Sequence, residues 1–238
     1  MTRGGERLKL LLLPGMLNDA TLWDRVSPRL SGACDLVMPV FTEDTSIVAM
    51  ADRALAMAGT GRLALVGFSM GGYVAQEILA MVPDRIHGIA LIDTQAGAAD
   101  GATKVIMAKT ANAARKDFEG VLSRLRPSNI HPSRLDDEEL VGHLMTMFRN
   151  VRAEAFIRQC AAVSDRPERR ETLKASNTPA LIVCGRDDMI CPPQRSQELA
   201  ALLPHAAVVW IDRCGHLSPL EQPDAVATAL TKWIGTLS

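Results

Sequence analysis

Ser69 lies in a segment whose residue types suit a nucleophile. The segment reads Gly67-Phe68-Ser69-Met70-Gly71, with Gly72 after it. Because the apolar run Leu63–Val66 precedes it and a helical pattern follows, we predict a sharp turn from strand to helix. Glycines on either side remove Cβ atoms that would collide in such a turn, and the first amides of the helix favour a developing negative charge. A glycine-rich connection with an incidental serine is the alternative interpretation.

A serine hydroxyl needs a base before it can attack a carbonyl carbon. The sequence offers five histidines, namely His87, His131, His143, His205 and His216. Only His216 follows a predicted strand, Ala207–Ile211, and loops at the carboxyl ends of parallel strands are where sites form in open sheets. The other four precede a strand, end a helix or lie in a long segment without strands. The pattern therefore favours His216 as the base.

The base needs a carboxylate to orient it, and the loop after the predicted strand Ala180–Cys184 offers Asp187 and Asp188. An aspartate that caps a turn or pairs with Arg186 would be the structural alternative for either residue. The chain order of serine, aspartate and histidine is typical of one particular fold, in which the same three side chains act together.

The elements that must position these residues follow from the hydrophobic pattern. Short apolar runs alternate with helical patterns, which predicts a parallel sheet covered by helices. The predicted strands are Leu8–Leu13, Leu36–Met38, Leu63–Val66, Gly88–Ile92, Ala180–Cys184 and Ala207–Ile211. The predicted helices between them are Ile47–Ala58, Met70–Met81, Gln194–Leu203 and Pro219–Ile234.

The alternation is interrupted once, between the fourth and fifth predicted strands. There, apolar residues recur at helical spacing, and the acidic run Asp136–Glu139 suits the positive end of a helix dipole. We therefore predict an α/β core made of residues 1–94 and 176–238, with residues 95–175 as a helical insertion. The insertion holds 13 Lys and Arg against 9 Asp and Glu between residues 103 and 170, a balance of +4 in a chain of net charge −1.

Composition excludes several classes of protein. The chain has 238 residues, of which 47% are hydrophobic and 22% are charged, a composition that excludes a disordered protein. No run approaches the roughly 18 consecutive apolar residues that a membrane-spanning helix needs. A net charge of −1 gives no electrostatic reason to expect binding to nucleic acid or to an anionic membrane. The apolar run Leu10–Leu13 is too short for a secretion signal, so we expect a cytoplasmic location and reduced thiols at all five cysteines.

Cysteines near His216 in the sequence could in principle bind a metal, but their spacing does not support it. Cys184, Cys191 and Cys214 match no common zinc spacing, and no Cys-x-x-Cys pair occurs. The sequence therefore predicts no metal site.

Four segments together resemble the α/β-hydrolase superfamily, in its branch of small cofactor-free esterases. They are Leu13-Pro14-Gly15-Met16-Leu17-Asn18-Asp19 with Trp23 downstream, Gly67 to Gly72, Gly185-Arg186-Asp187-Asp188 with Pro192, and Cys214-Gly215-His216-Leu217 with Glu221-Gln222-Pro223. The resemblance implies the α/β-hydrolase fold, a mostly parallel central sheet flanked by helices, with the insertion as a helical cap. It also implies a catalytic triad of Ser69, Asp188 and His216, with no cofactor.

The same resemblance implies an oxyanion hole made by the backbone amides of Met16 and Met70. Pro14 departs from the commoner pattern, in which a histidine occupies this position. We expect the fixed φ of Pro14 to hold the loop in place of some of the hydrogen bonds of that histidine. Leu17, Phe68 and Leu217 are expected to touch substrate. Methionines of the insertion either line an adaptable apolar pocket or pack the cap on the core, and Trp23 is expected to be a buried anchor.

The expected activity is hydrolysis of small or medium-sized carboxylic esters through an acyl-enzyme. Thioesterases, lactonases, carbon–carbon bond hydrolases and cofactor-free perhydrolases share the triad, and motifs do not separate them. A ligand receptor on a hydrolase scaffold is a remoter alternative. The basic insertion would suit an acidic substrate or an acidic carrier protein, although a solvated helical surface accounts for the same charge.

Overall fold

A six-stranded sheet forms the centre of the protein in a computed structural model that describes residues 7–237. The strand order is β2-β1-β3-β4-β5-β6, and every neighbouring pair is parallel. The strands are β1 (Lys9–Leu13), β2 (Asp35–Val37), β3 (Leu63–Phe68), β4 (Ile86–Ile92), β5 (Ala180–Gly185) and β6 (Ala207–Ile211). All six predicted strands are present, with ends shifted by at most two residues. Residues 1–6 and 238 of the predicted core segments lie outside the described part.

Apart from Lys9 and His87, the central strands β1, β3, β4 and β5 consist of apolar residues and glycine, which suits a sheet covered on both faces. Leu10 and Leu12 face one core layer, which includes residues of α9 (Pro223–Ile234), while Leu11 and Leu13 face the other. Alternate side chains of a strand point to opposite faces, so the four consecutive leucines serve both layers.

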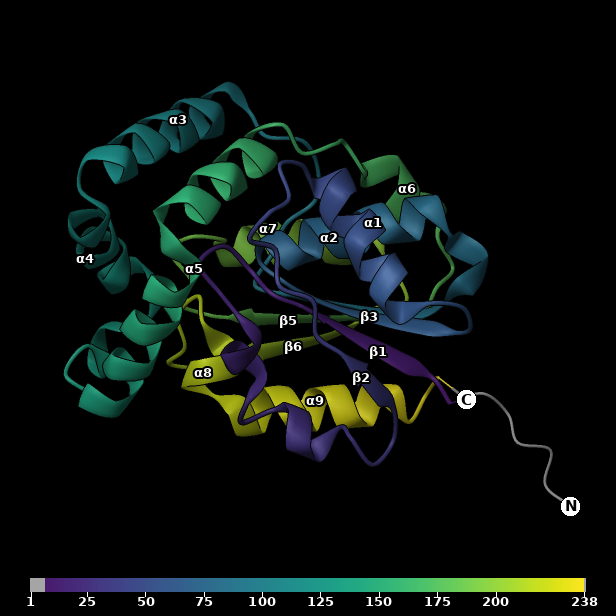
Figure 1. Cartoon of the computed structure of the whole chain (residues 1–238). Coiled ribbons are helices and arrows are strands. Elements are labelled where there is room, and N and C mark those ends of the chain that lie inside the picture. Colours follow the sequence, from purple (N-terminus) through teal and green to yellow (C-terminus); the bar gives the residue numbers. More distant parts are fainter. Residues whose placement is uncertain (1–6, 238) are drawn as a thin grey trace, which may run out of the picture.

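Helices cover the two faces of the sheet (Figure 1). On one face lie α1 (Ile47–Ala58), α2 (Met70–Met81) and α7 (Pro193–Leu202), and on the other lies α9. The first two helices have the predicted bounds. The predicted single helix Pro219–Ile234 is wrong, because the structure has α8 (Ser218–Glu221) and then α9, with a break at Gln222. Pro223 lacks a backbone N–H and suits the first turn of a new helix, which explains the break.

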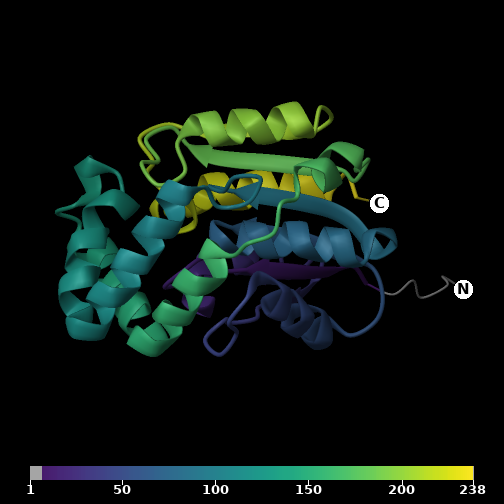
Figure 2. The same cartoon turned by 90° about the horizontal axis from the view of Figure 1, so that it is seen from above.

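The segment between β4 and β5 is helical, as predicted. It contains α3 (Gly101–Lys116), α4 (Phe118–Asn129), α5 (Glu138–Ser164) and α6 (Arg170–Ala175). Arg152 interrupts α5 with a φ of 66° and a ψ of 160°, so α5 consists of two helical stretches. Figure 2 shows that α3, α4 and α5 lie beyond the carboxyl ends of the strands, whereas α6 packs against α2 and α7.

Four short 3₁₀ helices complete the described elements: η1 (Ala20–Trp23), η2 (Ser27–Arg29), η3 (Pro83–Arg85) and η4 (Pro132–Arg134). Trp23, in η1, is fully buried, as expected for an anchor. Within residues 7–237, no helix has the length and apolar character needed to cross a membrane.

Candidate active site

Ser69 stands on a sharp turn between β3 and α2. Its backbone has a φ of 51° and a ψ of −116°, a conformation that L-residues adopt only under constraint. Two contacts hold the turn, one from the last residue of the neighbouring strand β4 and one from the loop after it. The Ser69 N–H donates to the Ile92 carbonyl at 2.9 Å, and Thr94 Oγ1 donates to the Ser69 carbonyl at 2.7 Å. The serine is thereby fixed at the carboxyl end of the sheet.

The glycines around Ser69 are required by close backbone approaches. A Cβ on Gly67 would lie 2.4 Å from the Gly71 carbonyl oxygen, and a Cβ on Gly71 would lie 2.1 Å from the Leu13 carbonyl oxygen. Both distances are far below van der Waals contact, as predicted from the sequence. The glycines therefore let α2 begin directly against the end of β1.

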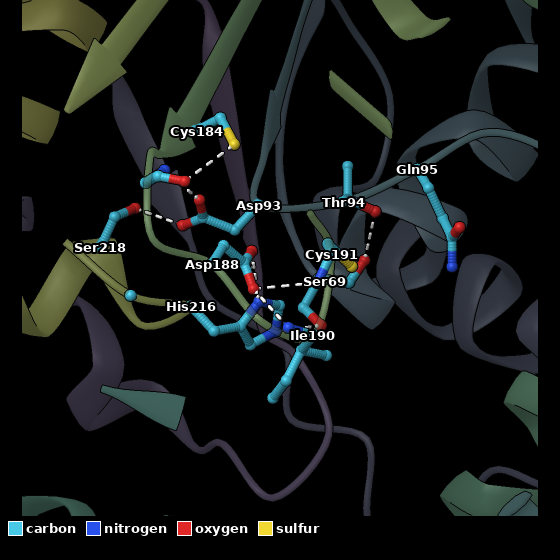
Figure 3. A network of polar contacts seen from close by, with 12 residues as sticks. Ser69, Asp93, Thr94, Gln95, Cys184, Asp188, Ile190, Cys191, His216 and Ser218 are labelled. Atoms are coloured by element: carbon cyan, nitrogen blue, oxygen red, sulfur yellow. Dashed lines mark hydrogen bonds and ion pairs between the residues drawn. The ribbon is translucent and has the colours of Figure 1, made fainter. Parts of the chain in front are cut away.

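His216 and Asp188 meet Ser69 at the same edge of the sheet (Figure 3). His216 Nε2 lies 2.9 Å from Ser69 Oγ, and His216 Nδ1 lies 2.8 Å from Asp188 Oδ2. His216 and Asp188 are each 3% exposed. The structure thus brings together the three predicted residues, in the order hydroxyl, imidazole, carboxylate, although Ser69 and His216 are 147 positions apart in the sequence.

The aspartate is fixed by its own loop. Asp188 Oδ1 accepts hydrogen bonds from the Ile190 N–H at 2.8 Å and the Cys191 N–H at 2.9 Å. The neighbouring Asp187 points elsewhere, and its Oδ2 lies 3.6 Å from His131 Nε2. Of the two candidate aspartates, only Asp188 contacts His216.

The loop that carries His216 is supported by a buried carboxylate that the sequence reasoning did not assign. Glu221 accepts from the Gly215 N–H at 2.9 Å and from the His131 N–H at 2.7 Å. Burial raises the pKa of Glu221, and the two backbone donors oppose that rise. Through these two bonds, Glu221 links the loop to the segment of the insertion that follows α4.

Asp93 is a second carboxyl group behind the site, and the sequence reasoning also missed it. It follows β4 with a φ of 46° and is fully buried. Its Oδ1 accepts from the Gly185 N–H at 2.8 Å, and its Oδ2 accepts from the Ser218 hydroxyl (Figure 3). Burial, followed by the charge of Asp188, raises the pKa of Asp93 to about 8. Asp93 thus ties β4 to the loops that carry Asp188 and His216.

The electrostatics of His216 suit a base. Burial lowers the pKa of the imidazole, but the charge and hydrogen bond of Asp188 outweigh it, so the pKa of His216 lies above its usual value. The Phe68 ring packs beside the imidazole, with ring centroids 5.2 Å apart. Asp188 therefore orients the imidazole through Nδ1, and Phe68 covers one side of the ring.

A mainly apolar cavity of about 150 Å³ opens above Ser69 and His216. Strand-end loops and the insertion both line it. The lining residues are Met16, Leu17, Asn18, Phe68, Ser69, Ile106, Met107, Thr110, Leu125, Asn129, Phe148, Phe156, Ile190 and His216. A larger hollow of about 280 Å³ around Arg134 and His143 is lined mostly by polar residues and includes none of these groups.

Of the predicted pocket residues, Leu17 and Phe68 line this cavity and Leu217 does not. Leu217 is 1% exposed, and its N–H donates to the Asn129 carbonyl at 2.9 Å, so it joins the His216 loop to α4. Met107 lines the cavity. Met147 instead lies 3.7 Å, through its sulfur, from Asn18 Nδ2.

Met16 lines the same cavity as Ser69, and Met70 follows Ser69 directly in the chain. Met70 is the first residue of α2, directly after Ser69, and Met16 lies in the turn after β1. Among the described residues, neither N–H donates a hydrogen bond to another protein group. Both N–H groups are therefore free to donate a hydrogen bond to a bound substrate oxygen.

One group of potential metal ligands occurs among residues 7–237, and it overlaps this site. Atoms of Asp188, Cys191 and His216 lie within 4.8 Å of one another. Asp188 and His216 already bind each other, and burial raises the pKa of the Cys191 thiol well above its usual value, which keeps its proton on. The donor set therefore does not favour a cation.

Comparison with known proteins gives a family and several relatives. The sequence profile described as "Alpha/beta hydrolase family" matches residues 10–229. The pimeloyl-[acyl-carrier protein] methyl ester esterase of Neisseria meningitidis is 24% identical over 234 residues, which cover 92% of this chain and 90% of that protein.

Among solved structures, a thermophilic esterase from Thermogutta terrifontis is 26% identical, with a TM-score of 0.90 over 98% of this chain and 91% of that chain. The enol-lactonase from Burkholderia xenovorans is 20% identical, with a TM-score of 0.85 over 98% of this chain and 93% of that chain, a likeness of fold.

Proposed function

The chain belongs to the alpha/beta hydrolase family, and on that premise we propose that it is a serine hydrolase that cleaves carboxylic esters of small or medium size. The observation that carries the proposal is the chain of contacts from Ser69 Oγ to His216 Nε2 at 2.9 Å and from His216 Nδ1 to Asp188 at 2.8 Å. Neither a metal nor an organic cofactor is needed for the steps that follow.

The reaction begins when Ser69 Oγ attacks the ester carbonyl and His216 Nε2 takes its proton. His216 then protonates the leaving alcohol, which leaves an acyl group on Ser69. A water molecule, deprotonated by His216, releases the acid and restores the serine. Asp188 keeps Nδ1 protonated and stabilises the imidazolium formed in each half of the cycle.

The carbonyl oxygen gains negative charge in both halves. We assign its stabilisation to the N–H groups of Met16 and Met70, which have no other acceptor among the described residues. The N-terminus of α2 adds the positive end of a helix dipole at the same point. Donors of this kind typically contribute about 3 kcal/mol each to the transition state.

The cavity indicates the substrate class. Its volume of about 150 Å³ and its apolar lining suit a short uncharged acyl group. The Neisseria relative is named for a methyl ester on an acyl-carrier protein, and the positive balance of the insertion would suit an acidic carrier of this kind. Many of these cations are engaged, as in the Arg149–Glu119 pair, so a free small ester is our first choice.

The decisive experiment compares the wild-type protein with Ser69→Ala on p-nitrophenyl acetate, butyrate and octanoate. We expect hydrolysis by the wild type and a loss of at least about 10⁴-fold in the variant. A fluorophosphonate probe should label Ser69 in the wild type, as read by peptide mass. Wild-type-like turnover by Ser69→Ala, or labelling at another serine, would refute the proposal.

A second panel separates the related reactions. Thioesters, lactones, methyl esters and peracid formation are measured beside the acyl esters, and the highest kcat/KM identifies the class of bond. Turnover slower than one per hour on every substrate, with tight binding of a small molecule, would instead indicate a receptor.

A further inference from the structure

The turn that presents Met16 has an unfavourable backbone. Residues Gly15 to Asn18 form it, and Leu17, at its third position, has a φ of 59°. Glycine or asparagine usually fills such a position, because a larger side chain strains the left-handed conformation. The bond that closes the turn, from the Asn18 N–H to the Gly15 carbonyl, is long at 3.4 Å. The turn therefore depends on support from outside.

That support comes from the insertion. Gln159, in the second stretch of α5, is fully buried, and its Oε1 accepts from the Leu17 N–H at 3.0 Å. Its Nε2 donates to the Phe41 carbonyl at 2.8 Å. Both halves of one amide are thus satisfied by backbone groups of two different core loops, 142 and 118 residues away.

The bond to Leu17 fixes the orientation of the peptide that joins Met16 to Leu17. Without an acceptor, the buried Leu17 N–H would be unpaired, and the leucine would gain by returning to a negative φ. That return rotates the Met16–Leu17 peptide and shifts Met16. The amide of Met16 would then no longer be held beside Ser69.

We propose that Gln159 is a positioning residue, which holds the Met16 amide in the oxyanion hole by anchoring the Leu17 N–H. The inference rests on the proposed function, because that function gives the Met16 amide its role. If Gln159 has this role, the core by itself does not fix the oxyanion hole. The geometry of the hole then depends on how α5 packs on the core.

The neighbouring residue provides a matched control. Arg158 donates to the Thr42 carbonyl at 3.0 Å through Nε and at 2.6 Å through a terminal nitrogen, and it lies 3.5 Å from Glu43. It therefore docks the same stretch of α5 on the same core loop that Gln159 reaches through Phe41, without touching the turn at Leu17. An Arg158→Met variant weakens docking and leaves the anchor of the turn in place.

The test compares Gln159→Met, Gln159→Glu and Arg158→Met with the wild type on a p-nitrophenyl ester, with melting temperatures measured in parallel. For Gln159→Met we expect kcat to fall about 10- to 100-fold with KM within about twofold, because only transition-state stabilisation is lost. The Ki of a boronic acid, which mimics the tetrahedral oxyanion, should rise by the same factor. Gln159→Glu keeps an acceptor for the Leu17 N–H, and its carboxyl group, protonated because it is buried, still donates to the Phe41 carbonyl, so this variant should recover most of the activity.

Arg158→Met should melt at a lower temperature but keep its kcat and its boronic acid Ki. Equal losses of kcat in Gln159→Met and Arg158→Met, or a loss confined to KM, would overturn the inference. If Gln159→Met does not fold, Gln159→Asn, whose amide is one methylene too short to reach Leu17, replaces it. Failure of the proposed function is recognised separately, by a wild type that neither hydrolyses esters nor labels at Ser69.

Discussion

The strand-end loops of the core and the helices of the insertion line one cavity, but they are built in different ways. In the core, short-range and neighbouring-strand bonds fix each reacting side chain, as when Ile190 and Cys191 bind Asp188 and Thr94 binds the Ser69 carbonyl. The insertion instead contributes mostly apolar side chains from helix faces, with Thr110 and Asn129 as polar members. One of the apolar residues, Ile106, is 56% exposed at the cavity.

This difference suggests a division of roles. Groups that are fixed within a tight loop can keep the donor–acceptor distance of a proton transfer constant to a few tenths of an ångström, and the reaction requires such precision. Groups on helices that partly face solvent can be replaced without disturbing those loops. We therefore expect changes in the core to act on kcat and changes in the insertion to act on substrate preference, with Gln159 as the exception that joins the two.

The largest predicted effect comes from the core. Asp188→Asn should lower kcat by about 10⁴-fold, because the amide holds the imidazole in the wrong tautomer. The matched control is Asp187→Asn, whose carboxylate faces His131 rather than His216, and we expect it to change kcat by less than about twofold. Steady-state kinetics on one ester measure both. A large loss in Asp187→Asn with a small loss in Asp188→Asn would reverse the assignment.

A smaller effect is predicted for the insertion. Ile106→Ala should lower kcat/KM for octanoate roughly fivefold and leave acetate unchanged, because a half-exposed wall of the pocket contributes about 1 kcal/mol to binding a longer chain. Val105→Ala is the control, since Val105 is 52% exposed but does not line the cavity. The comparison between core and insertion fails if Ile106→Ala lowers kcat for acetate as much as for octanoate.

The sequence predicts the parts of the site that depend on local pattern. The strands, the turn at Ser69 and the place of His216 could be predicted because each is marked by an apolar run with a glycine or histidine at or soon after its carboxyl end. The same pattern left Asp187 and Asp188 as alternatives, and only the resemblance to the α/β-hydrolase superfamily favoured Asp188. The close approach of Gly71 to Leu13 confirms that those glycines answer a steric need.

The parts that were missed depend on contacts between distant segments. Gln159 is one glutamine in a long helix, and nothing near it in sequence indicates a partner 142 residues away. Asp93 could be noticed as an aspartate after a strand, but its role requires knowing that β4 lies beside β5 and near α8. The break before Pro223 was a local signal and could have been predicted from the proline.

The dependence of activity on pH tests the arrangement of the core, because the titrating base, His216, lies there. His216 must be neutral to accept the serine proton, and its pKa is raised by Asp188 against the effect of burial. Activity should therefore fall as the pH drops through a value above 6.5, the ordinary histidine pKa. The measurement is kcat/KM for p-nitrophenyl acetate from pH 5 to 9, with folding checked by circular dichroism at each pH. An acid limb centred at or below 6.5 would contradict the arrangement.

The smallest effect on activity is predicted for Asp93→Asn, which alters the support behind the reacting groups. Its folded pKa of about 8 lies above the ordinary value of 3.8. Between those values the unfolded chain has lost a proton that the folded protein keeps, so the wild-type free energy of unfolding should fall as pH rises from about 4 to about 8, by up to about 1.4 kcal/mol per pH unit. Asparagine tolerates a positive φ and can keep both contacts, accepting from the Gly185 N–H and donating to Ser218.

The variant should therefore lose this part of the pH dependence while its kcat changes by less than about threefold. Urea titrations of both proteins at pH 5, 6, 7 and 8 measure the two slopes, and the groups common to both proteins cancel in the difference. Parallel slopes would mean that Asp93 is ionised in the folded protein. A large loss of kcat with unchanged slopes would instead show that Asp93 takes part in the reaction. The reacting groups would then include Asp93, at the end of β4, as well as Asp188.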